Sequence, residues 1–252
     1  MKIDRVHQLQ QNMEAHEIDA AIIMQHRDLY YYSGTAQPCN LIIPPKGDPI
    51  LLVRRGESFV KEETWIASYE KGGGPRNILE HLKKQGIDHG VLGLEFDTIP
   101  YGLINRMAQV FDKYSFVDIS PLILAQRMTK DPDEIELIRG ATRRFDMAHQ
   151  TILKNLRPGL HEVEIASKIA EKLIRNETEQ ILFLRRWDDW LQAMGGAIAS
   201  GENLVRISGH AHTVTGVGLG AALPWGPSDR VLQEGDLVVV DIPLNYRGYH
   251  SD

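Results

Sequence analysis

Two aspartates close to the end of the printed sequence could act together. The last stretch is "GDLVVVDIPLNYRGYHSD", in which Asp241 ends a run of valines and Asp252 ends the short segment "YHSD". The β-branched run predicts a strand, the Pro, Asn and Gly of "PLNYRG" predict a turn, and "YHSD" predicts the start of a return strand. If Asn245 and Gly248 flank a two-residue loop, Asp241 and Asp252 lie directly opposite each other, with Cβ atoms roughly 4.5–5.5 Å apart.

Carboxylates placed in this way repel each other. Burial of such a pair is tolerated when a cation neutralises it or when one carboxyl keeps its proton. Carboxylates from facing strands are also the hard oxygen ligands that a Mn, Co or Zn hydrolase centre uses. The alternative is that each Asp accepts backbone hydrogen bonds at the end of its strand or faces solvent.

Other residues of catalytic type have less support from their surroundings. His210 and His212 in "GHAHT" share one face if the segment is a strand, as metal ligands often do, and otherwise belong to an exposed loop. Glu162 and Glu164 are predicted to lie in a solvated first helical turn. Cys39 is predicted to be a small core residue rather than a nucleophile.

One arginine-rich cluster, "FLRRWDDW", sets two arginines beside two aspartates between aromatic residues. It could form an interface or a pocket wall, but salt-bridged packing is the simpler expectation. The arginines are Arg185 and Arg186, and the aspartates are Asp188 and Asp189.

The first half of the chain alternates helix and strand patterns. Apolar residues recur at helical spacing from Ile3 to Met13, and "AAIIM" then reads as a buried strand. "NLIIPPKGDPILLVRR" predicts a hairpin, "RNILEHLKKQG" a helix that Gly86 ends, and "GVLGLEF" a further strand. A second helix, "LINRMAQVFDKY", and a strand, "SFVDIS", follow. This order predicts an α/β domain with a largely parallel or mixed sheet.

The pattern changes at "QRMTKDPDEIELIRGATRRFDMAHQTILKNLRPG". Asp131 can cap a long helix, and Pro132 suits its first turn. "HEVEIASKIAEKLIRN" predicts a second helix, and from about residue 195 the chain is Gly-rich with strand candidates. We therefore predict two domains, residues 1–127 and residues 128–252.

Composition limits the possible functions. The chain has 252 residues, of which 42% are hydrophobic and 25% charged, which is typical of a globular protein. It has no apolar run of roughly 20 residues that could cross a bilayer, and its start lacks the apolar core of a signal peptide, so we expect a cytoplasmic protein. A net charge of -6 without a dense Lys/Arg block favours neither nucleic acid nor an anionic membrane as partner. The single cysteine excludes an intrachain disulfide and a thiolate metal cage.

Three segments resemble the pita-bread hydrolases, a family that comprises Xaa-Pro aminopeptidases, prolidases, methionine aminopeptidases and creatinase. "PSDRVLQEGDLVVVDIPLNYRGYHSD" resembles the segment in which the peptidases carry their first two metal ligands, and Asp241 and Asp252 match those aspartates. "LRPGLHEVEIA" resembles the turn between the first two helices of their catalytic domain. "DLYYYSGTAQPCNLIIPPKGDPILLVRR" resembles the creatinase-type N-terminal domain of the aminopeptidase P and prolidase branch.

The resemblance implies an α/β creatinase-like N-terminal domain followed by an incomplete α+β pita-bread domain. It also implies a metallopeptidase that hydrolyses the bond before proline with two divalent ions, Mn, Co or Zn, acts on a peptide with proline at the second position, and forms a homodimer. Trp225 in "ALPWGPSD" stands where many relatives have a His near the substrate, so Trp225 is a candidate substrate-binding residue. His210 and His212 are two further candidates.

The same resemblance places one His and two Glu ligands downstream of the second Asp. Because the sequence ends at Asp252, we expect a chain truncated within its catalytic domain, with weak or absent metal binding and no activity alone. The alternative from a different class is a complete, noncatalytic dimerisation or binding module of the same fold.

Overall fold

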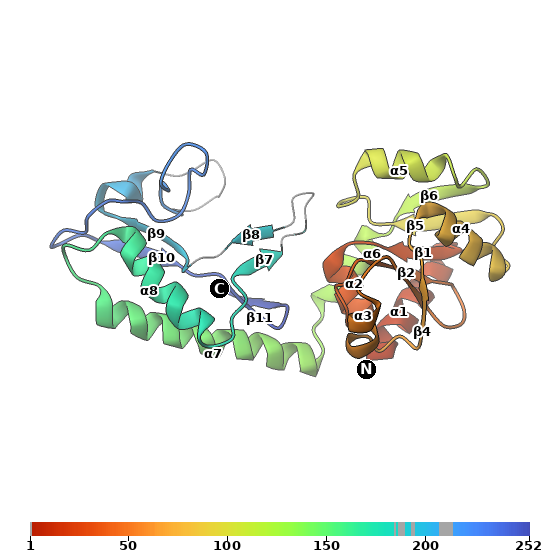
Figure 1. The fold of residues 1–252 in the computed structure, drawn as a ribbon, viewed down its shortest axis with the longest axis horizontal. Helices are drawn as coiled ribbons and strands as arrows, with labels where there is room; N and C mark the ends of the chain where they lie inside the picture. Colours follow the sequence, from red (N-terminus) through yellow and green to blue (C-terminus); the bar gives the residue numbers. More distant parts are fainter. Residues whose placement is uncertain (1, 184, 186–189, 193–194, 207–213) are drawn as a thin grey trace. The chain divides into compact units, whose positions relative to one another are not determined.

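The chain folds into two compact units in a computed structural model (Figure 1). The structure describes residues 2–183, 185, 190–192, 195–206 and 214–252. Unit 1 contains residues 1–130 together with 185–188, and unit 2 contains residues 131–184 and 189–252. Each unit is described by itself below.

Unit 1 alternates helices and strands along the chain. Its elements are α1 (Lys2–Ala15), β1 (Ala20–Ile23), α2 (His26–Ser33), β2 (Cys39–Ile43), β3 (Ile50–Val53), α3 (Glu57–Glu63), β4 (Ser68–Lys71), α4 (Pro75–Lys84), β5 (Gly90–Leu94), α5 (Tyr101–Ala108), β6 (Tyr114–Asp118) and α6 (Ser120–Met128).

These strands form one mixed six-stranded sheet in the order β4-β3-β2-β1-β5-β6. The predicted hairpin is confirmed, since β2 pairs antiparallel with β3 and Leu41 lies opposite Leu51. β1 also pairs antiparallel with β2, whereas the β1–β5, β5–β6 and β3–β4 pairs are parallel. The predicted α/β class with a mixed sheet is therefore correct.

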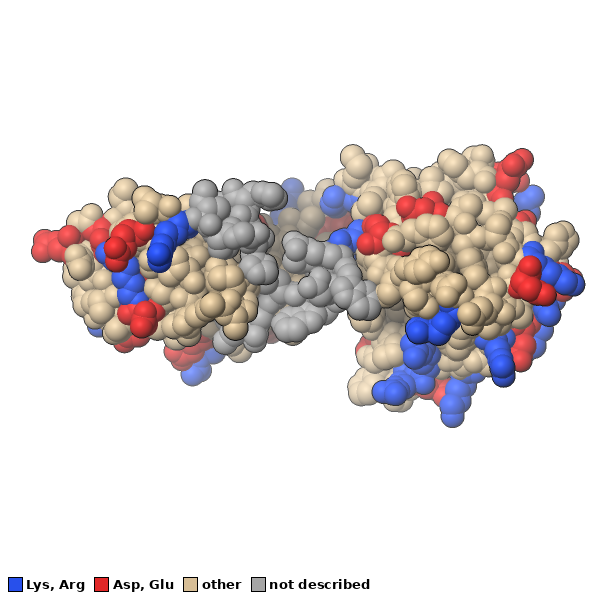
Figure 2. Space-filling model, turned by 90° about the horizontal axis from the view of Figure 1, so that it is seen from above, with Lys and Arg blue, Asp and Glu red and all other residues tan. Residues whose placement is uncertain are grey.

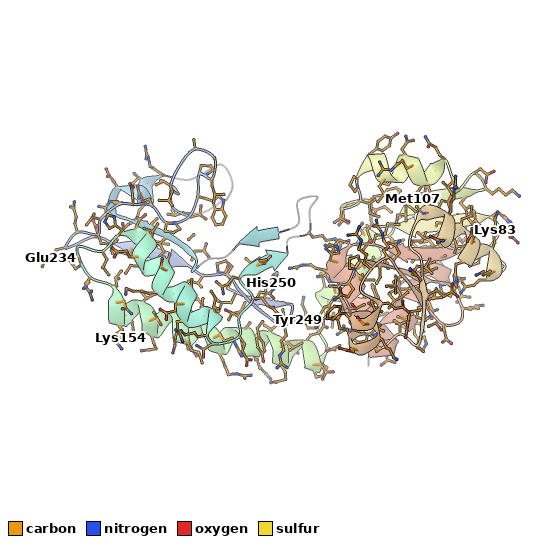
Figure 3. All side chains as sticks on the ribbon, viewed as in Figure 1. Lys83, Met107, Lys154, Glu234, Tyr249 and His250 are labelled. Atoms are coloured by element: carbon orange, nitrogen blue, oxygen red, sulfur yellow. The ribbon has the colours of Figure 1, made fainter. Side chains whose placement is uncertain are left out.

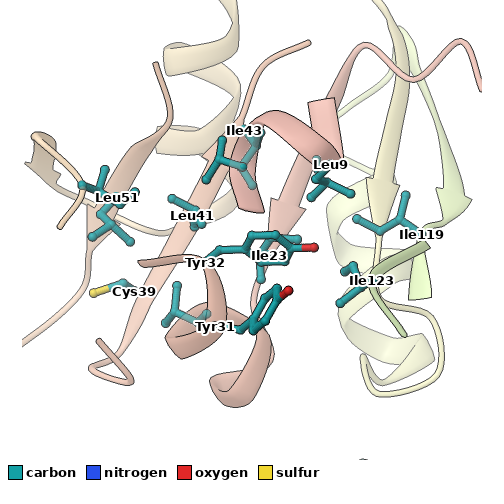
Figure 4. Close-up of a cluster of buried hydrophobic side chains, with 14 of the residues drawn as sticks. Leu9, Ile23, Tyr31, Tyr32, Cys39, Leu41, Ile43, Leu51, Ile119 and Ile123 are labelled. Atoms are coloured by element: carbon teal, nitrogen blue, oxygen red, sulfur yellow. The ribbon is translucent and has the colours of Figure 1, made fainter. Parts of the chain in front are cut away.

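Strands β1, β2 and β3 of unit 1 are buried throughout, and because side chains alternate along a strand they bury both faces. In β1, Ala21 and Ile23 pack into one core, and Ala20 and Ile22 into the other. Helices α1, α2, α3 and α6 cover the first core, drawn in Figure 4, and helices α4 and α5 cover the second. Cys39 lies in the first core at 4% exposure, as predicted.

Several short elements of unit 1 were not predicted from the sequence: α2, α3, β4 and α6. Helix α2 begins after Gln25, whose side-chain oxygen accepts hydrogen bonds from the backbone N–H groups of Arg27 and Asp28. Gln is not among the favoured N-cap residues, so the sequence carries a weak start signal there.

Unit 2 combines two long helices with short strands. Its elements are α7 (Pro132–Asn155), α8 (Glu162–Ile174), β7 (Ile181–Phe183), β8 (Trp190–Gln192), β9 (Ala197–Ser200), the 3₁₀ helix η1 (Gly201–Val205), β10 (Val238–Asp241), β11 (Leu244–Tyr246) and β12 (Tyr249–Ser251). Asp131 caps α7 as predicted, and Glu134 completes the capping box by accepting from the Asp131 N–H.

The described strands of unit 2 pair as three two-stranded sheets, β9–β10, β11–β12 and β7–β8. The core lies between the helices and the first two of these sheets, where Ala148 of α7 and Ile169 of α8 pack with Ile198, Ile242 and Leu244. An α+β arrangement follows the α/β unit, as expected.

The predicted register of the last hairpin is wrong. Leu244 lies opposite Ser251 and Tyr246 opposite Tyr249, so the loop residues are Arg247 and Gly248, not the pair between Asn245 and Gly248. Both loop residues have positive φ, 50° and 80°, as a type I′ turn requires. Asp241 and Asp252 are consequently not a directly opposed cross-strand pair.

The surface carries charges of both signs. On the face drawn in Figure 2, acidic and basic side chains are scattered among uncharged residues. No helix within the described ranges is long and apolar enough to cross a membrane.

Candidate metal centre

Asp241 is the last residue of β10 and is held by pairing with β9. The antiparallel ladder sets Val238 opposite Ser200 and Asp241 opposite Ala197. Gly196, at φ 92°, precedes β9, and a Cβ on it would lie 2.5 Å from the Asp241 carbonyl oxygen. Glycine is therefore needed here, since only its bare backbone allows this close approach.

Asp252 follows β12, which packs against α7 rather than against β10. The Tyr249 hydroxyl donates to Glu134 Oε1 at 3.0 Å, and the hydroxyls of Thr142 and Ser251 lie 3.0 Å apart. Figure 3 labels Tyr249 and His250 on this strand. Residues of α7 thus determine where the strand, and the aspartate that follows it, can lie.

The two carboxyl groups meet despite the unexpected register. The pKa of Asp241 is raised above its ordinary value, first because the half-buried carboxyl is desolvated, and then because the Asp252 carboxyl lies beside it. A proton on one of two adjacent carboxyl groups removes their mutual repulsion. A divalent cation could replace that proton and remove the repulsion.

The carboxylate oxygens of Asp241 and Asp252 suit a hard divalent cation, but they provide only part of its coordination sphere. Asp241 and Asp252 supply carboxylate oxygens, which Mn²⁺ accepts readily and which Zn²⁺ and Co²⁺ also accept. Within the described part of the chain, no group of three or more His, Cys, Asp or Glu side chains could hold a metal ion. Among the described residues, these two carboxylates are therefore the candidate ligands of such an ion.

The candidate substrate-binding residues are placed only in part. Trp225 is half-buried in a loop where the Gly226 N–H donates to the Thr215 carbonyl at 2.7 Å and the Gly218 N–H donates to the Gly226 carbonyl at 2.9 Å. His210 and His212 lie outside the described residues.

Glu162 is fully buried, which corrects the prediction of a solvated helical turn; its neighbour Glu164 is exposed, as predicted. The Glu162 carboxylate accepts hydrogen bonds from the N–H and the hydroxyl of Ser200, at 2.7 and 2.6 Å, and from those of Ser228, at 2.9 and 2.6 Å. The Asn203 amide donates to both of its oxygens. Glu162 therefore joins the end of β9 to the loop that follows Trp225.

Unit 1 contains a second carboxyl pair that the sequence did not indicate. Glu95 and Asp28 are both fully buried and adjacent to each other. Burial, followed by the adjacent Asp28, raises the pKa of Glu95 well above its ordinary value, which favours its protonated form. Glu95 follows β5 and Asp28 lies in α2, and no spacing signal connects positions so far apart in sequence.

Two arginines balance the charge on Asp28. Arg127 Nη1 donates to Asp28 Oδ1 at 2.6 Å, and Arg185 donates to Asp28 Oδ2 and, through Nε, to Asp97 Oδ2 at 2.5 Å. Arg185 is thus salt-bridged to Asp28 and Asp97, which are distant from it in the sequence. Arg186, Asp188 and Asp189 lie outside the described residues.

Comparison with known families agrees with this division of the fold. Residues 5–129 match the creatinase/prolidase N-terminal domain, and residues 136–252 match metallopeptidase family M24. Together these matches define a two-domain protein of metallopeptidase type. The chain belongs to the pita-bread Xaa-Pro peptidase family.

Individual relatives are similar over most of this chain. An Xaa-Pro dipeptidase of Pyrococcus furiosus is 26% identical over 99% of the chain, and a probable dipeptidase PepE of Mycobacterium tuberculosis is 32% identical over 84% of it. The crystal structure of the Pyrococcus horikoshii prolidase covers 99% of the chain at 25% identity with a TM-score of 0.75. The chain spans 63% of the Pyrococcus furiosus protein and 57% of PepE.

Proposed function

We propose that this chain belongs to a metal-dependent hydrolase that cleaves the peptide bond before proline. In this proposal Asp241 and Asp252 are two of the ligands of a divalent metal centre, and residues 1–127 and 128–252 are its functional domains. The observation that carries the proposal is the Asp241–Asp252 contact, in which the pKa of Asp241 is raised by its burial and by the neighbouring carboxyl.

The roles of the chain's residues follow from their chemistry. A bound Mn, Co or Zn ion lowers the pKa of a water ligand and polarises the substrate carbonyl. Asp241 and Asp252 hold that ion as anionic oxygen ligands, while Trp225, together with His210 and His212, contacts the substrate. Trp225 supplies an apolar face and one N–H donor, and it cannot exchange a proton as an imidazole does.

Substrate and assembly are inferred from the relatives. The names of the Pyrococcus relatives, Xaa-Pro dipeptidase and prolidase, support a peptide with proline at the second position as the substrate. We further propose a cytoplasmic homodimer; the dimer is what the resemblance to the pita-bread hydrolases implies.

Mn²⁺ binding to the purified chain tests the metal site. We expect weak binding, measured as loss of the electron paramagnetic resonance signal of free Mn²⁺, because two carboxylates leave most of the coordination sphere to water. Asp241→Asn and Asp252→Asn should each weaken binding at least about tenfold. The exposed Asp229→Asn variant, matched in charge change, should bind as the parent does.

Two results would contradict this proposal. Mn²⁺ binding that both site variants leave unchanged would remove Asp241 and Asp252 from the metal site. We also expect negligible cleavage of Xaa-Pro dipeptides by this chain alone, since two ligands do not fix a dinuclear centre. Chelator-sensitive turnover by the 252-residue chain would refute that expectation.

A further inference from the structure

The two aspartates of the candidate metal centre are held by different parts of unit 2. Asp241 belongs to the β9–β10 ladder, and Asp252 follows β12, which among the described strands pairs with β11 alone. No ladder between described residues pairs the two aspartates. Their contact therefore depends on the position in which the β11–β12 hairpin packs against the other elements of unit 2.

The hairpin contacts α7 through the ring of Tyr246, the last residue of β11. The Arg144 guanidinium of α7 lies over this ring, with Cζ 3.6 Å from the ring centroid. Gly140, one turn earlier in α7, leaves the space that the ring occupies, since a Cβ on it would lie 2.7 Å from Tyr246 Cε1 and 2.8 Å from Cδ1. The ring is thus in contact with a glycine and a cation that lie on one face of α7.

Arg144 is itself immobilised, and its side chain is only 16% exposed. Its Nε donates to the Asn176 carbonyl at 2.6 Å, its Nη1 donates to the Gly140 carbonyl at 3.0 Å, and its Nη2 lies 3.5 Å from Glu177 Oε2. Three in-plane contacts of this kind fix a guanidinium and leave its flat face for stacking.

The segment that follows α8 hydrogen-bonds to the same hairpin. The Glu179 N–H donates to the Asn245 carbonyl at 2.9 Å, and the Gly248 N–H of the turn donates to Glu179 Oε2 at 3.0 Å. Because Arg144 binds the Asn176 carbonyl of this segment, it connects the segment, α7 and the Tyr246 ring.

We propose that Arg144 and Gly140 are positioning residues. They hold the Tyr246 ring in place on α7, and this position of the hairpin brings Asp252 next to Asp241. Neither residue contacts either carboxyl group in this arrangement; both act through the hairpin. The consequence for metal binding rests on the proposed function, but the placement of the two aspartates does not.

The test measures the placement without a metal. In a Cys39→Ala background, the paired substitutions Asp241→Cys and Asp252→Cys place a thiol at each position, and the rate of intramolecular cross-linking by a short bifunctional thiol reagent reports their proximity. We expect Arg144→Met to slow cross-linking at least fivefold and Arg144→Lys, which keeps the charge without the planar face, to slow it less. Arg139→Met is the matched control, because Arg139 lies on the same helix, is 65% exposed and pairs with Glu136.

A second variant covers the case in which Arg144→Met does not fold. Gly140→Ala keeps the guanidinium but places a methyl group against the ring, and it should also slow cross-linking at least fivefold. In a Tyr246→Leu background, which lacks the ring, the same Gly140→Ala change should slow it no further. If the effect of Gly140→Ala requires the ring, it comes from the contact with Tyr246 and not from a general loss of stability. Circular dichroism and thermal unfolding measure the stability of each variant.

The outcomes separate this inference from the proposed function. Cross-linking at the parental rate in folded Arg144→Met or Gly140→Ala would overturn the positioning role, whatever the metal binding. Slowed cross-linking in both variants would support the positioning role, even if Mn²⁺ binding by the unsubstituted chain proved independent of Asp241 and Asp252. Mn²⁺ binding that does not depend on Asp241 and Asp252 would refute the proposed function but not the positioning role.

Discussion

The carboxyl groups of Asp241 and Asp252 lie beside each other although the register of the last hairpin does not set the two residues opposite each other. Asp241 ends β10, which pairs with β9. The β11–β12 hairpin packs on α7, and this packing places Asp252 next to Asp241. Burial raises the pKa of Asp241, and the contact raises it further, because an ionised Asp241 would lie beside a second acidic group.

Asp252→Asn should lower the pKa of Asp241. The substitution removes the repulsion and provides an amide that can donate to the Asp241 carboxylate, so we expect the pKa of Asp241 to decrease. Titration of the Asp241 carboxyl carbon by NMR measures this change. An unchanged Asp241 titration in Asp252→Asn, or an equal decrease in the exposed control Asp229→Asn, would show that Asp252 is not the neighbour responsible.

Glu95→Gln should make the stability of unit 1 less sensitive to rising pH. A carboxyl whose folded pKa is raised contributes stability that is fully present below its unfolded pKa, near 4.5, and that is lost as the pH rises through its folded pKa. Gln keeps an acceptor for the Met24 and Gln25 N–H groups and donates to Asp28 without ionising.

Urea unfolding followed by tryptophan fluorescence checks this prediction. Between pH 5 and pH 8 we expect the free energy of unfolding of the parent to fall relative to that of Glu95→Gln. The exposed Glu80→Gln, also in unit 1, should follow the parent. Parallel pH profiles for the parent and Glu95→Gln would mean that Glu95 does not hold a proton in the folded state.

Glu162→Gln should destabilise unit 2. The new amide would direct N–H groups at the donors of Ser200 or Ser228 and leave a buried backbone N–H without its acceptor, at a cost of about 2–3 kcal/mol. Chemical denaturation measures the change in the free energy of unfolding. Glu171→Gln, which breaks an exposed pair with Arg175, should cost less than about 0.5 kcal/mol, and equal costs for the two variants would argue against a special role for Glu162.

Cys39 should react slowly with thiol reagents in the folded protein. Burial raises the pKa of its thiol to about 11, so only about 0.1% is thiolate at pH 8, and the side chain is also shielded. Labelling with a chromogenic disulfide should therefore be at least about a hundredfold slower in buffer than in denaturant. Equal rates in the two conditions would place Cys39 on the surface.

Much of the fold was predictable from local signals. The hairpin of residues 40–55 follows from apolar runs around a Pro/Gly turn, and α7 begins where Asp131 and Pro132 predict. The last hairpin shows the limit of such signals. Its turn residues suggested a loop after Asn245, yet the loop begins after Tyr246, and a shift of this size changes which residues face each other without changing the composition of the strands.

By itself, the sequence determined that the first unit is an α/β layer structure, that a capped helix starts after Asp131, and that two aspartates follow strands near residue 252. These features depend on residues that are neighbours along the chain. Only the tertiary structure decided that Glu162 is buried among Ser200 and Ser228, 38 and 66 positions away, and that Glu95 is buried beside Asp28. Burial and the pKa of a carboxyl depend on which distant donors and charges surround it, and folding alone brings those groups together.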